Sequence, residues 1–557
     1  MAQPLGFACL GVCLITVAGC GERADSLEPP EPAARARVLA TGAGISGANG
    51  LHFSPDGQLY VASVIGSELV VLDPERGDVR RRLTAADGVH GPDDVAFAPD
   101  GAFYWTSILT GEVAGFSAAG ERVVAAELTP GVNPITFAPD GRLFVAQCFF
   151  GDGLYEIDPR GRREPRLIAD DLGPGCGLNG MDWGPDDRLY GPRWFHGEVV
   201  SFDVETAERR LEADGFEVPA AVKFDSRGRL HVLDTLAGRI FRVSGGEKEV
   251  VAELTPGLDN LAFDADDRLY VSSFTDGFVW RLEEDGGITE LSPGGMAHPG
   301  GVAVLEPADG PPLVMVADLH ALRGFDAQSG EEVLTQRNIV GVGELGSVLS
   351  VAADGGNVII SAFSEDDVRI WDPVAEREVA RYRGLQQPVS AIRYRDLVAV
   401  AEHGTGRVVG VTKDAVVALA TGLPAPTGLA SDGERLFVSD RARGEILEIA
   451  RGGEAVEPRV LAAGLNAPEG IVWSDRGLVV VEGESGRVLQ VNEDGSSRLL
   501  AVIAPGTPPA SEAQPPSMVL QGVAVLSDTL FLTGETSRVL YAVDLPPRAA
   551  DAGALAE

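Results

Sequence analysis

Six short side chains introduce six similar segments in the first half of the chain. The phrase "NGLHFSPDG" at 49–57 returns as "NGMDWGPDD" at 179–187, and related phrases lie between and after them. The leading residues are Asn49, Asp93, Asn133, Asn179, Ala220 and Asp259. Amide and carboxylate oxygens that converge without His or thiolate suit a hard cation, and a loose oxygen cage suits Ca²⁺ better than Mg²⁺. The alternative is turn chemistry, because Asn and Asp are common strand-entry residues.

Other candidate binding residues are fewer and more scattered. In the second half, the corresponding leading residues are Gly300, Ser347, Ser390, Thr427, Glu469 and Gln521, among which Glu469 is the one carboxylate. Arg193, Trp194 and His196 in "RWFHGE" could contact an anionic or sugar-like ligand, although a single loop His is usually solvated. The sequence contains no zinc-type His spacing, no phosphate-binding glycine loop and no Gly-x-Ser-x-Gly motif.

The spacing of these segments predicts the elements that would position them. Twelve copies start at about 40-residue intervals, and each continues into further short apolar runs after an Asp-Gly type of turn. Four strands per repeat are typical of a β-propeller blade. Twelve blades exceed the usual number in one ring, so we expect an all-β fold of two consecutive six-bladed β-propellers with four-stranded blades.

The ends of the repeat array suggest how each ring closes. "RVLATG" at 37–42 resembles a fourth strand without the preceding three, and the last repeat has three strands without a fourth. We expect "RVLATG" to complete the sixth blade and "GITELS" at 287–292 to complete the twelfth, which leaves no open sheet edge. The first propeller would then span 37–286 and the second 287–548, followed by a disordered tail at 549–557.

The amino-terminal segment predicts export. Residues 1–19 are short and apolar, and "VAGC" resembles the lipobox of bacterial lipoproteins, in which Cys20 would become the acylated first residue. The segment lacks the usual early Lys or Arg. Residues 20–36 are an acidic, Pro-containing tether. We expect a lipid-anchored protein of the bacterial cell envelope, periplasmic or associated with the outer membrane, and a secreted one if the lipobox is not used.

The net charge limits the classes of partner that this protein can bind, and the cysteines indicate a disulfide. The formal net charge of −38 argues against nucleic acid and against an anionic bilayer, so contact with the membrane is expected through the lipid anchor alone. Cys9 and Cys13 would leave with the signal peptide. Cys148 and Cys176 then remain as a pair in an exported protein, where a disulfide between them is favoured.

The repeats resemble NHL-type repeats and the six-bladed propellers of the gluconolactonase and regucalcin (senescence marker protein) family. "NGMDWGPDD" is similar to the family motif that carries a metal-ligand Asn, which implies that role for Asn179. "GPDDVAFAPDG" is similar to the segment with a second channel Asn, with Asp93 in its place. The family's first-blade Glu corresponds to Asn49, and its fifth-blade Asp, both ligand and presumed general base, corresponds to Ala220.

Two functions follow from these patterns. The first is an envelope-anchored binding module that presents loop faces to a small molecule, a glycan or a protein, with a Ca²⁺ site, or a site for another hard divalent cation, in the first channel. The alternative is a metal-dependent hydrolase, similar to lactonases, or a lyase that acts at the mouth of the first propeller. Ala220 in place of the expected base favours the binding module.

Overall fold

The computed structural model describes residues 32–173, 175–307, 310–505, 520–534 and 536–546. The expected signal peptide, Cys20, most of the tether and the tail at 549–557 lie outside these residues. Within them the chain forms twelve antiparallel four-stranded sheets and two short 3₁₀ turns, η1 (Ala85–Asp87) and η2 (Trp194–His196). No helix in the described part of the chain is long and apolar enough to cross a membrane.

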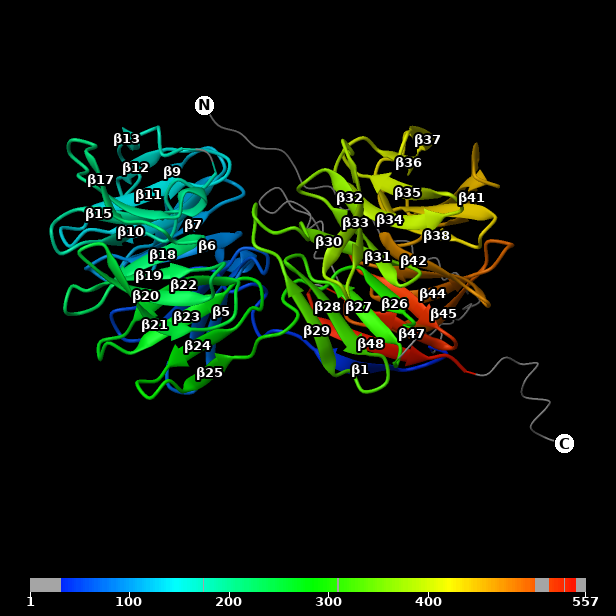
Figure 1. Ribbon diagram of the computed structural model, residues 1–557, viewed down its shortest axis with the longest axis horizontal. Coiled ribbons are helices and arrows are strands. Elements are labelled where there is room, and N and C mark those ends of the chain that lie inside the picture. Colours follow the sequence, from blue (N-terminus) through cyan, green and yellow to red (C-terminus); the bar gives the residue numbers. More distant parts are fainter. Residues whose placement is uncertain (1–31, 174, 308–309, 506–519, 535, 547–557) are drawn as a thin grey trace, which may run out of the picture.

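Six of the sheets form the first propeller, in the blue to green half of Figure 1. From the channel outward, its first three blades are β2 (Leu51–Phe53), β3 (Leu59–Ser63), β4 (Glu68–Leu72), β5 (Val79–Leu83); β6 (Pro92–Phe97), β7 (Phe103–Ser107), β8 (Glu112–Phe116), β9 (Arg122–Glu127); and β10 (Val132–Phe137), β11 (Leu143–Gln147), β12 (Leu154–Ile157), β13 (Arg166–Ala169). The next three are β14 (Asp182–Trp183), β15 (Leu189–Arg193), β16 (Glu198–Phe202), β17 (Arg209–Ala213); β18 (Pro219–Phe224), β19 (Leu230–Asp234), β20 (Arg239–Ser244), β21 (Glu247–Glu253); and β22 (Leu258–Phe263), β23 (Leu269–Ser273), β24 (Val279–Leu282), β25 (Ile288–Ser292).

The other six sheets form the second propeller. Its first three blades are β26 (Val302–Leu305), β27 (Leu313–Ala317), β28 (Ala321–Asp326), β29 (Glu332–Arg337); β30 (Val348–Asp354), β31 (Asn357–Ala362), β32 (Asp367–Asp372), β33 (Arg377–Arg383); and β34 (Pro388–Tyr394), β35 (Leu397–Glu402), β36 (Arg407–Val411), β37 (Val416–Thr421). The last three are β38 (Pro426–Ser431), β39 (Arg435–Asp440), β40 (Glu445–Arg451), β41 (Glu454–Ala463); β42 (Pro468–Ser474), β43 (Gly477–Glu482), β44 (Arg487–Val491), β45 (Ser497–Val502); and β46 (Val523–Leu526), β47 (Thr529–Leu532), β48 (Val539–Asp544), β1 (Ala36–Thr41).

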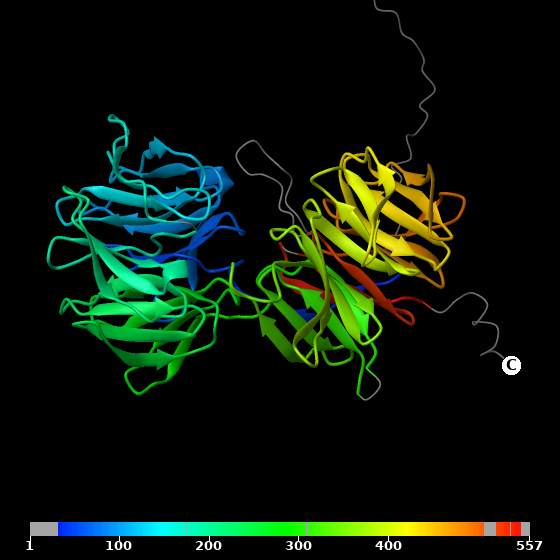
Figure 2. The same ribbon diagram turned by 45° about the horizontal axis from the view of Figure 1, so that its top comes forward.

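In each propeller the innermost strands contact one another around a ring. β2 meets both β6 and β22, and β26 meets both β30 and β46, so each set of six blades closes on itself. The turned view in Figure 2 shows the two propellers as separate lobes joined by short connections. The prediction of two consecutive six-bladed propellers is therefore confirmed.

The expected closure scheme is wrong. β1 pairs antiparallel with β48, with Ala36 opposite Val543 and Thr41 opposite Val539, so it completes the twelfth blade and not the sixth. Figure 1 shows this blue strand beside the red β48 at the far end of the sequence. The sixth blade is completed by its own next strand, β25, which follows β24 through a tight turn. A local hairpin needs no distant partner, whereas β48 has no described strand after it to cover its edge.

The first propeller is therefore one continuous segment that ends at Ser292, beyond the expected boundary at residue 286. The second propeller is discontinuous, because it takes β1 from a point before the first propeller. The predicted domains 37–286 and 287–548 would have separated β25 from the rest of the sixth blade and β1 from the rest of the twelfth.

A hydroxyl clasp repeats where neighbouring blades meet. Ser272 Oγ on β23 donates to Asn49 O at 2.6 Å, and Thr533 Oγ1 after β47 donates to Gly300 O, so both ring closures contain it. Thr106 on β7 donates in the same way to Asn133 O within the first ring, and Ser439 on β39 to Glu469 O at 2.7 Å within the second. These bonds hold the starts of four inner strands against the blade before each of them.

The two propellers are joined by a double crossing of the chain and by buried ion pairs. The segments after β1 and after β25 run past each other, with Ala43 N donating to Met296 O at 2.8 Å. Arg323 on β28 is 2% exposed and contacts Asp276 of the first propeller at 2.7 Å and Asp318 of the second at 2.5 Å. Arg337 also reaches Asp276, at 2.8 Å. A paired, hydrogen-bonded guanidinium at this depth favours one fixed arrangement of the two lobes.

Candidate functional site

The six leading residues of the first propeller lie at one mouth of its channel. Asp93, Asn133 and Asp259 belong to the inner strands β6, β10 and β22, while Asn49 and Asn179 come just before β2 and β14. The backbone links them around the ring, as where Gly50 N donates to Asp93 O at 2.9 Å. Gly50 permits this contact, because a Cβ there would meet Asp94 at 2.1 Å.

The five oxygen-bearing side chains differ in what they already bind. Asn49 Oδ1 accepts from Val64 N at 3.1 Å, and Asn179 Oδ1 accepts from Gly180 N at 3.0 Å. Within the described residues, no side-chain hydrogen bond engages Asp93, Asn133 or Asp259. Asp93 is 6% exposed and Asn133 is 8% exposed, and Asp259 keeps some contact with the channel opening. Three nearly buried side chains therefore hold oxygens without a protein partner.

Electrostatics in this mouth disfavour the charged carboxylates. Burial, followed by the charges of Asp259 and Asp94, raises the pKa of Asp93 well above its ordinary value. Burial, followed by Asp94, raises the pKa of Asp259 to about 8. A carboxyl pair of this kind keeps a proton at neutral pH unless a cation replaces it.

The donor set fits a hard cation. Asp93 and Asp259 would supply charge, Asn133 a free amide oxygen, and Asn49 and Asn179 further amide oxygens whose second lone pairs remain. The described residues contain no group of three or more His, Cys, Asp or Glu that could hold a metal. Amide oxygens must therefore complete any coordination, which suits Ca²⁺ better than a transition metal. Ala220 is 1% exposed and brings no titratable group to this mouth.

A second layer of titratable side chains, which was not predicted from the sequence, fills the channel below the mouth. Lys223 Nζ donates to Met181 O at 3.0 Å, and Asp182 accepts from Phe224 N at 2.8 Å. Asp94 accepts from Val95 N at 2.9 Å. Burial, followed by the Lys223 charge, lowers the pKa of His52 to about 4. Lys223, Asp182 and His52 each stand three residues after a leading residue, and that regular position was the available signal.

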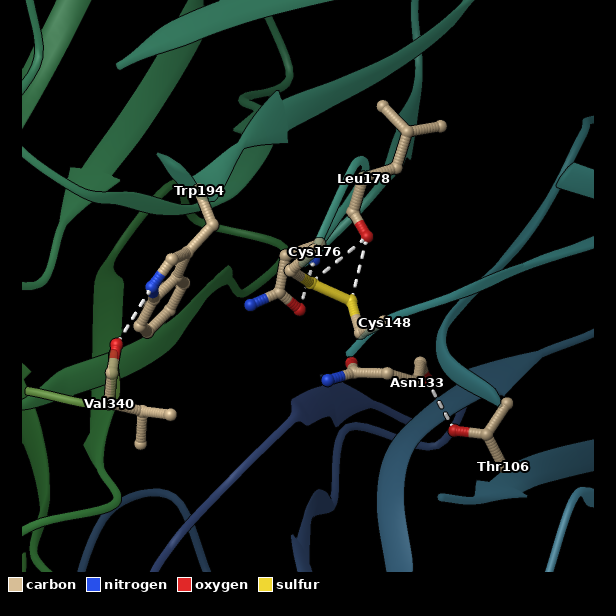
Figure 3. Close-up of a disulfide and its surroundings, with 9 residues drawn as sticks. Thr106, Asn133, Cys148, Cys176, Leu178, Trp194 and Val340 are labelled. Carbon is tan, nitrogen blue, oxygen red and sulfur yellow. Dashed lines mark hydrogen bonds between the residues drawn. A yellow bond between two sulfur atoms is a disulfide. The ribbon is translucent and has the colours of Figure 1, made fainter. Parts of the chain in front are cut away.

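Cys148 and Cys176 form a disulfide beside the mouth (Figure 3). Their Cα atoms lie 4.0 Å apart, and 28 residues separate them in sequence. Cys148 N donates to Gly131 O at 2.6 Å, which holds the bridge against the start of β10. Asn133 lies next to the bridge in Figure 3. The disulfide therefore connects the second-strand end of the third blade to the loop that leads to Asn179.

The weaker candidates Arg193, Trp194 and His196 are engaged in packing. Arg193 pairs with Glu198 and donates to Leu172 O at 2.9 Å. Trp194 Nε1 donates to Val340 O of the second propeller at 3.2 Å, a contact drawn in Figure 3. His196 Nε2 lies 3.1 Å from Arg193 Nη2, and burial followed by the Arg193 charge lowers the pKa of His196. Trp194 therefore reaches the second propeller, whereas Arg193 and His196 contact residues of the first propeller.

The second propeller has a different mouth. Gly301 N donates to Leu349 O, as Gly50 N does to Asp93 O, so Leu349 leads the second inner strand and not Ser347 as expected. By the same alignment Val389 leads the third in place of Ser390. Glu469 is fully buried, with Oε2 accepting from Gln521 N at 2.7 Å and Oε1 contacting Arg441 Nε at 3.1 Å. Glu469 is therefore the one carboxylate among the leading residues of this ring, and it is already paired.

Comparison with known proteins gives similar solved structures but no family assignment. No family model and no curated protein matches it. Similar solved structures include virginiamycin B lyase from Staphylococcus aureus, with 14% identity and a TM-score of 0.37 over 49% of this chain and 92% of that chain. Another is the extracellular domain of a putative one-component system from B. thetaiotaomicron, with 11% identity and a TM-score of 0.32 over 91% of this chain and 82% of that chain.

Proposed function

We propose that this protein is an envelope-anchored binding module whose first propeller holds Ca²⁺ at its channel mouth. The observation that carries the proposal is the pair Asp93 and Asp259, which are enclosed at one mouth without a partner for their carboxyl oxygens. The cation would be held by Asp93, Asp259 and Asn133, with Asn49 and Asn179 completing the cage. A bound cation would offer open positions to an oxygen-bearing ligand, such as a small molecule, a glycan or a protein side chain.

The alternative, a metal-dependent hydrolase or lyase, needs a base beside the cation. Ala220 occupies the position at which the resemblance to lactonases places that base, and His196 is turned toward Arg193. Lys223 is buried in the layer below, and its amine is engaged with Met181 O. An enzyme would need a base that this mouth does not present, whereas a binding module needs none, so the binding module is favoured.

Calorimetric titration of the purified protein with Ca²⁺ tests the proposal. We expect binding, release of protons from the carboxyl pair, and a higher melting temperature, because a ligand specific to the folded state stabilises it by mass action. The double variant Asp93→Ala, Asp259→Ala should lose all three effects. The control is Glu121→Ala with Glu127→Ala, which removes two exposed carboxylates from the same propeller. Identical melting with Ca²⁺ and with chelator would overturn the cation site.

Two further measurements separate the remaining alternatives. A screen of lactones, esters and lyase substrates in the presence of Ca²⁺ should give no turnover, and turnover that Asp93→Ala abolishes would establish the enzyme instead. For the anchor, incorporation of labelled palmitate in the native host should depend on Cys20, which Cys20→Ala tests directly. Release of unlabelled wild-type protein into the medium would show that the lipobox is not used.

A further inference from the structure

The channel of the second propeller contains a cavity of about 290 Å³. The first strands of all six blades line it: β26, β30, β34, β38, β42 and β46. The cavity extends from the mouth at Glu469 and Gln521 to Val525 and Trp473, near the opposite ends of those strands. It is close to the lower end of the size range of small-molecule sites.

One position in each repeat lines this cavity with an aliphatic side chain. Three residues after each leading residue, the second propeller has Ala303, Ala352, Ile392, Ala430, Val472 and Ala524, all of which line the cavity. The same position in the first propeller holds His52, Asp182 and Lys223, with Ala96, Thr136 and Ala262. Small aliphatic side chains at this position, in place of His52, Asp182 and Lys223, leave room in the channel and give it an apolar layer.

Glycines elsewhere in the inner strands do not widen the channel. A Cβ on Gly428 would meet Glu469 O at 2.3 Å, and one on Gly522 would meet Val302 N at 2.5 Å. These glycines allow each inner strand to approach the next, so the ring of six stays tight. The space is therefore a narrow axial channel with a fixed cross-section, and a slender molecule fits it best.

The mouth of the cavity is polar and accepts hydrogen bonds. Gln521 is 1% exposed and borders the cavity, and within the described residues its Oε1 has no hydrogen-bond partner. Beside it, Arg441 is shared between Glu469 at 3.1 Å and Glu484 at 3.2 Å. These three side chains together carry two formal negative charges and one positive charge, and they lie beside the Gln521 acceptor. A buried acceptor without a partner costs stability, which a donating ligand group would recover.

We propose that the second channel is a separate binding site for a slender aliphatic molecule that carries a protonated amine. The aliphatic part lies along the alanine-lined channel, and the ammonium group donates to Gln521 Oε1 beside the negative charge of Glu469 and Glu484. This site does not depend on the cation in the first propeller, because the two channels belong to different rings.

Titration of the full protein with three probes of equal chain length tests the proposal. We expect n-hexylamine to bind about tenfold more tightly than 1-hexanol, which keeps the chain and loses the charge, and hexanoate to bind weakest. Tighter binding of hexanoate would overturn the charge assignment, since Arg441 would then be the anchor. Equal binding of the amine and the alcohol, or no binding of any probe at millimolar concentration, would also overturn the proposal.

Variants locate the binding. Ala352→Leu places extra methyl groups in the channel and should abolish hexylamine binding, while Gln521→Leu should weaken it about tenfold. Glu484→Gln, at the more exposed partner of Arg441, should weaken it less than Gln521→Leu. The control Asp93→Ala, Asp259→Ala guards against amine bound at the other acidic mouth and should leave hexylamine binding unchanged. Binding that survives in a folded Ala352→Leu protein, or that falls in the control, would place the amine elsewhere.

Discussion

The first propeller is made from one uninterrupted stretch of chain, whereas the second takes its last strand from the opposite end of the sequence. Both rings use a hydroxyl clasp at the closing blade, so the clasp is not what distinguishes them. The channels differ as well, since Lys223 and its acidic neighbours fill the first and alanines open the second. The same repeat therefore supports two closures and two channels, and the residues that differ are few.

Removal of β1 should give the largest difference in stability between the two propellers. A chain that starts at residue 42 loses the strand that covers β48, with five paired residues, at a cost of about 5 kcal/mol to the second propeller. The first propeller should be unaffected. Hydrogen exchange followed by mass spectrometry reports each propeller separately, and a chain that starts at residue 32 is the control. Equal protection of β46–β48 in both chains would contradict the assigned closure.

The disulfide should stabilise the first propeller alone. Cys148→Ala with Cys176→Ala opens a loop of 28 residues and should lower the free energy of unfolding by about 3 kcal/mol on chain-entropy grounds. The same exchange experiment should show the loss in β10–β15 and none in the second propeller. Loosening of Asn133 should also weaken Ca²⁺ binding. A uniform loss across both propellers would mean that the bridge acts through the junction instead.

The carboxyl pair should make the stability of the first propeller fall as pH rises. The pKa of Asp259 is about 8 in the folded state, above its ordinary value of 3.8 in an unfolded chain. The folded state then binds more protons between these values. The contribution of Asp259 to stability is therefore fully present below about pH 4 and is lost as the pH rises through about 8. Asp259→Asn should flatten this slope, as should saturating Ca²⁺. Thermal melts from pH 5 to 9 measure it, and a slope that survives both changes would exclude the pair as its cause.

The charged layer of the first channel should give the smallest effect. Lys223→Met removes the second cause of the low pKa of His52, so that pKa should rise while burial keeps it below its ordinary value. NMR titration of the His52 ring measures the change. His320, whose pKa is lowered by burial in the second propeller, is the internal control and should not move. An unchanged His52 would separate it from Lys223.

The repeat pattern was sufficient to predict the fold, because each blade has its own alternation of apolar residues and its own turn residues. It could not decide which blade receives β1, since a strand sequence such as "RVLATG" carries no signal for a particular distant edge. It also misplaced Ser347 and Ser390, because weaker repeats allow a shift of one or two residues. The leading residues of the first propeller were easier to align, since similar sequence motifs follow Asn49, Asp93, Asn133 and Asn179. Lys223 and Asp182 were overlooked because they stand inside strands where apolar residues were expected.

The pairing of β1 with β48 also sets an order of events as the chain emerges. β1 emerges before every other described strand, yet Thr41 pairs with Val539, which is among the last described residues to emerge. The first propeller can complete its ring and fold while the backbone of β1 is still unpaired. The second propeller can be finished only after β48 emerges. A chain whose last strand has not yet emerged therefore carries one finished lobe and two exposed strand edges, and in this form it would need a chaperone most.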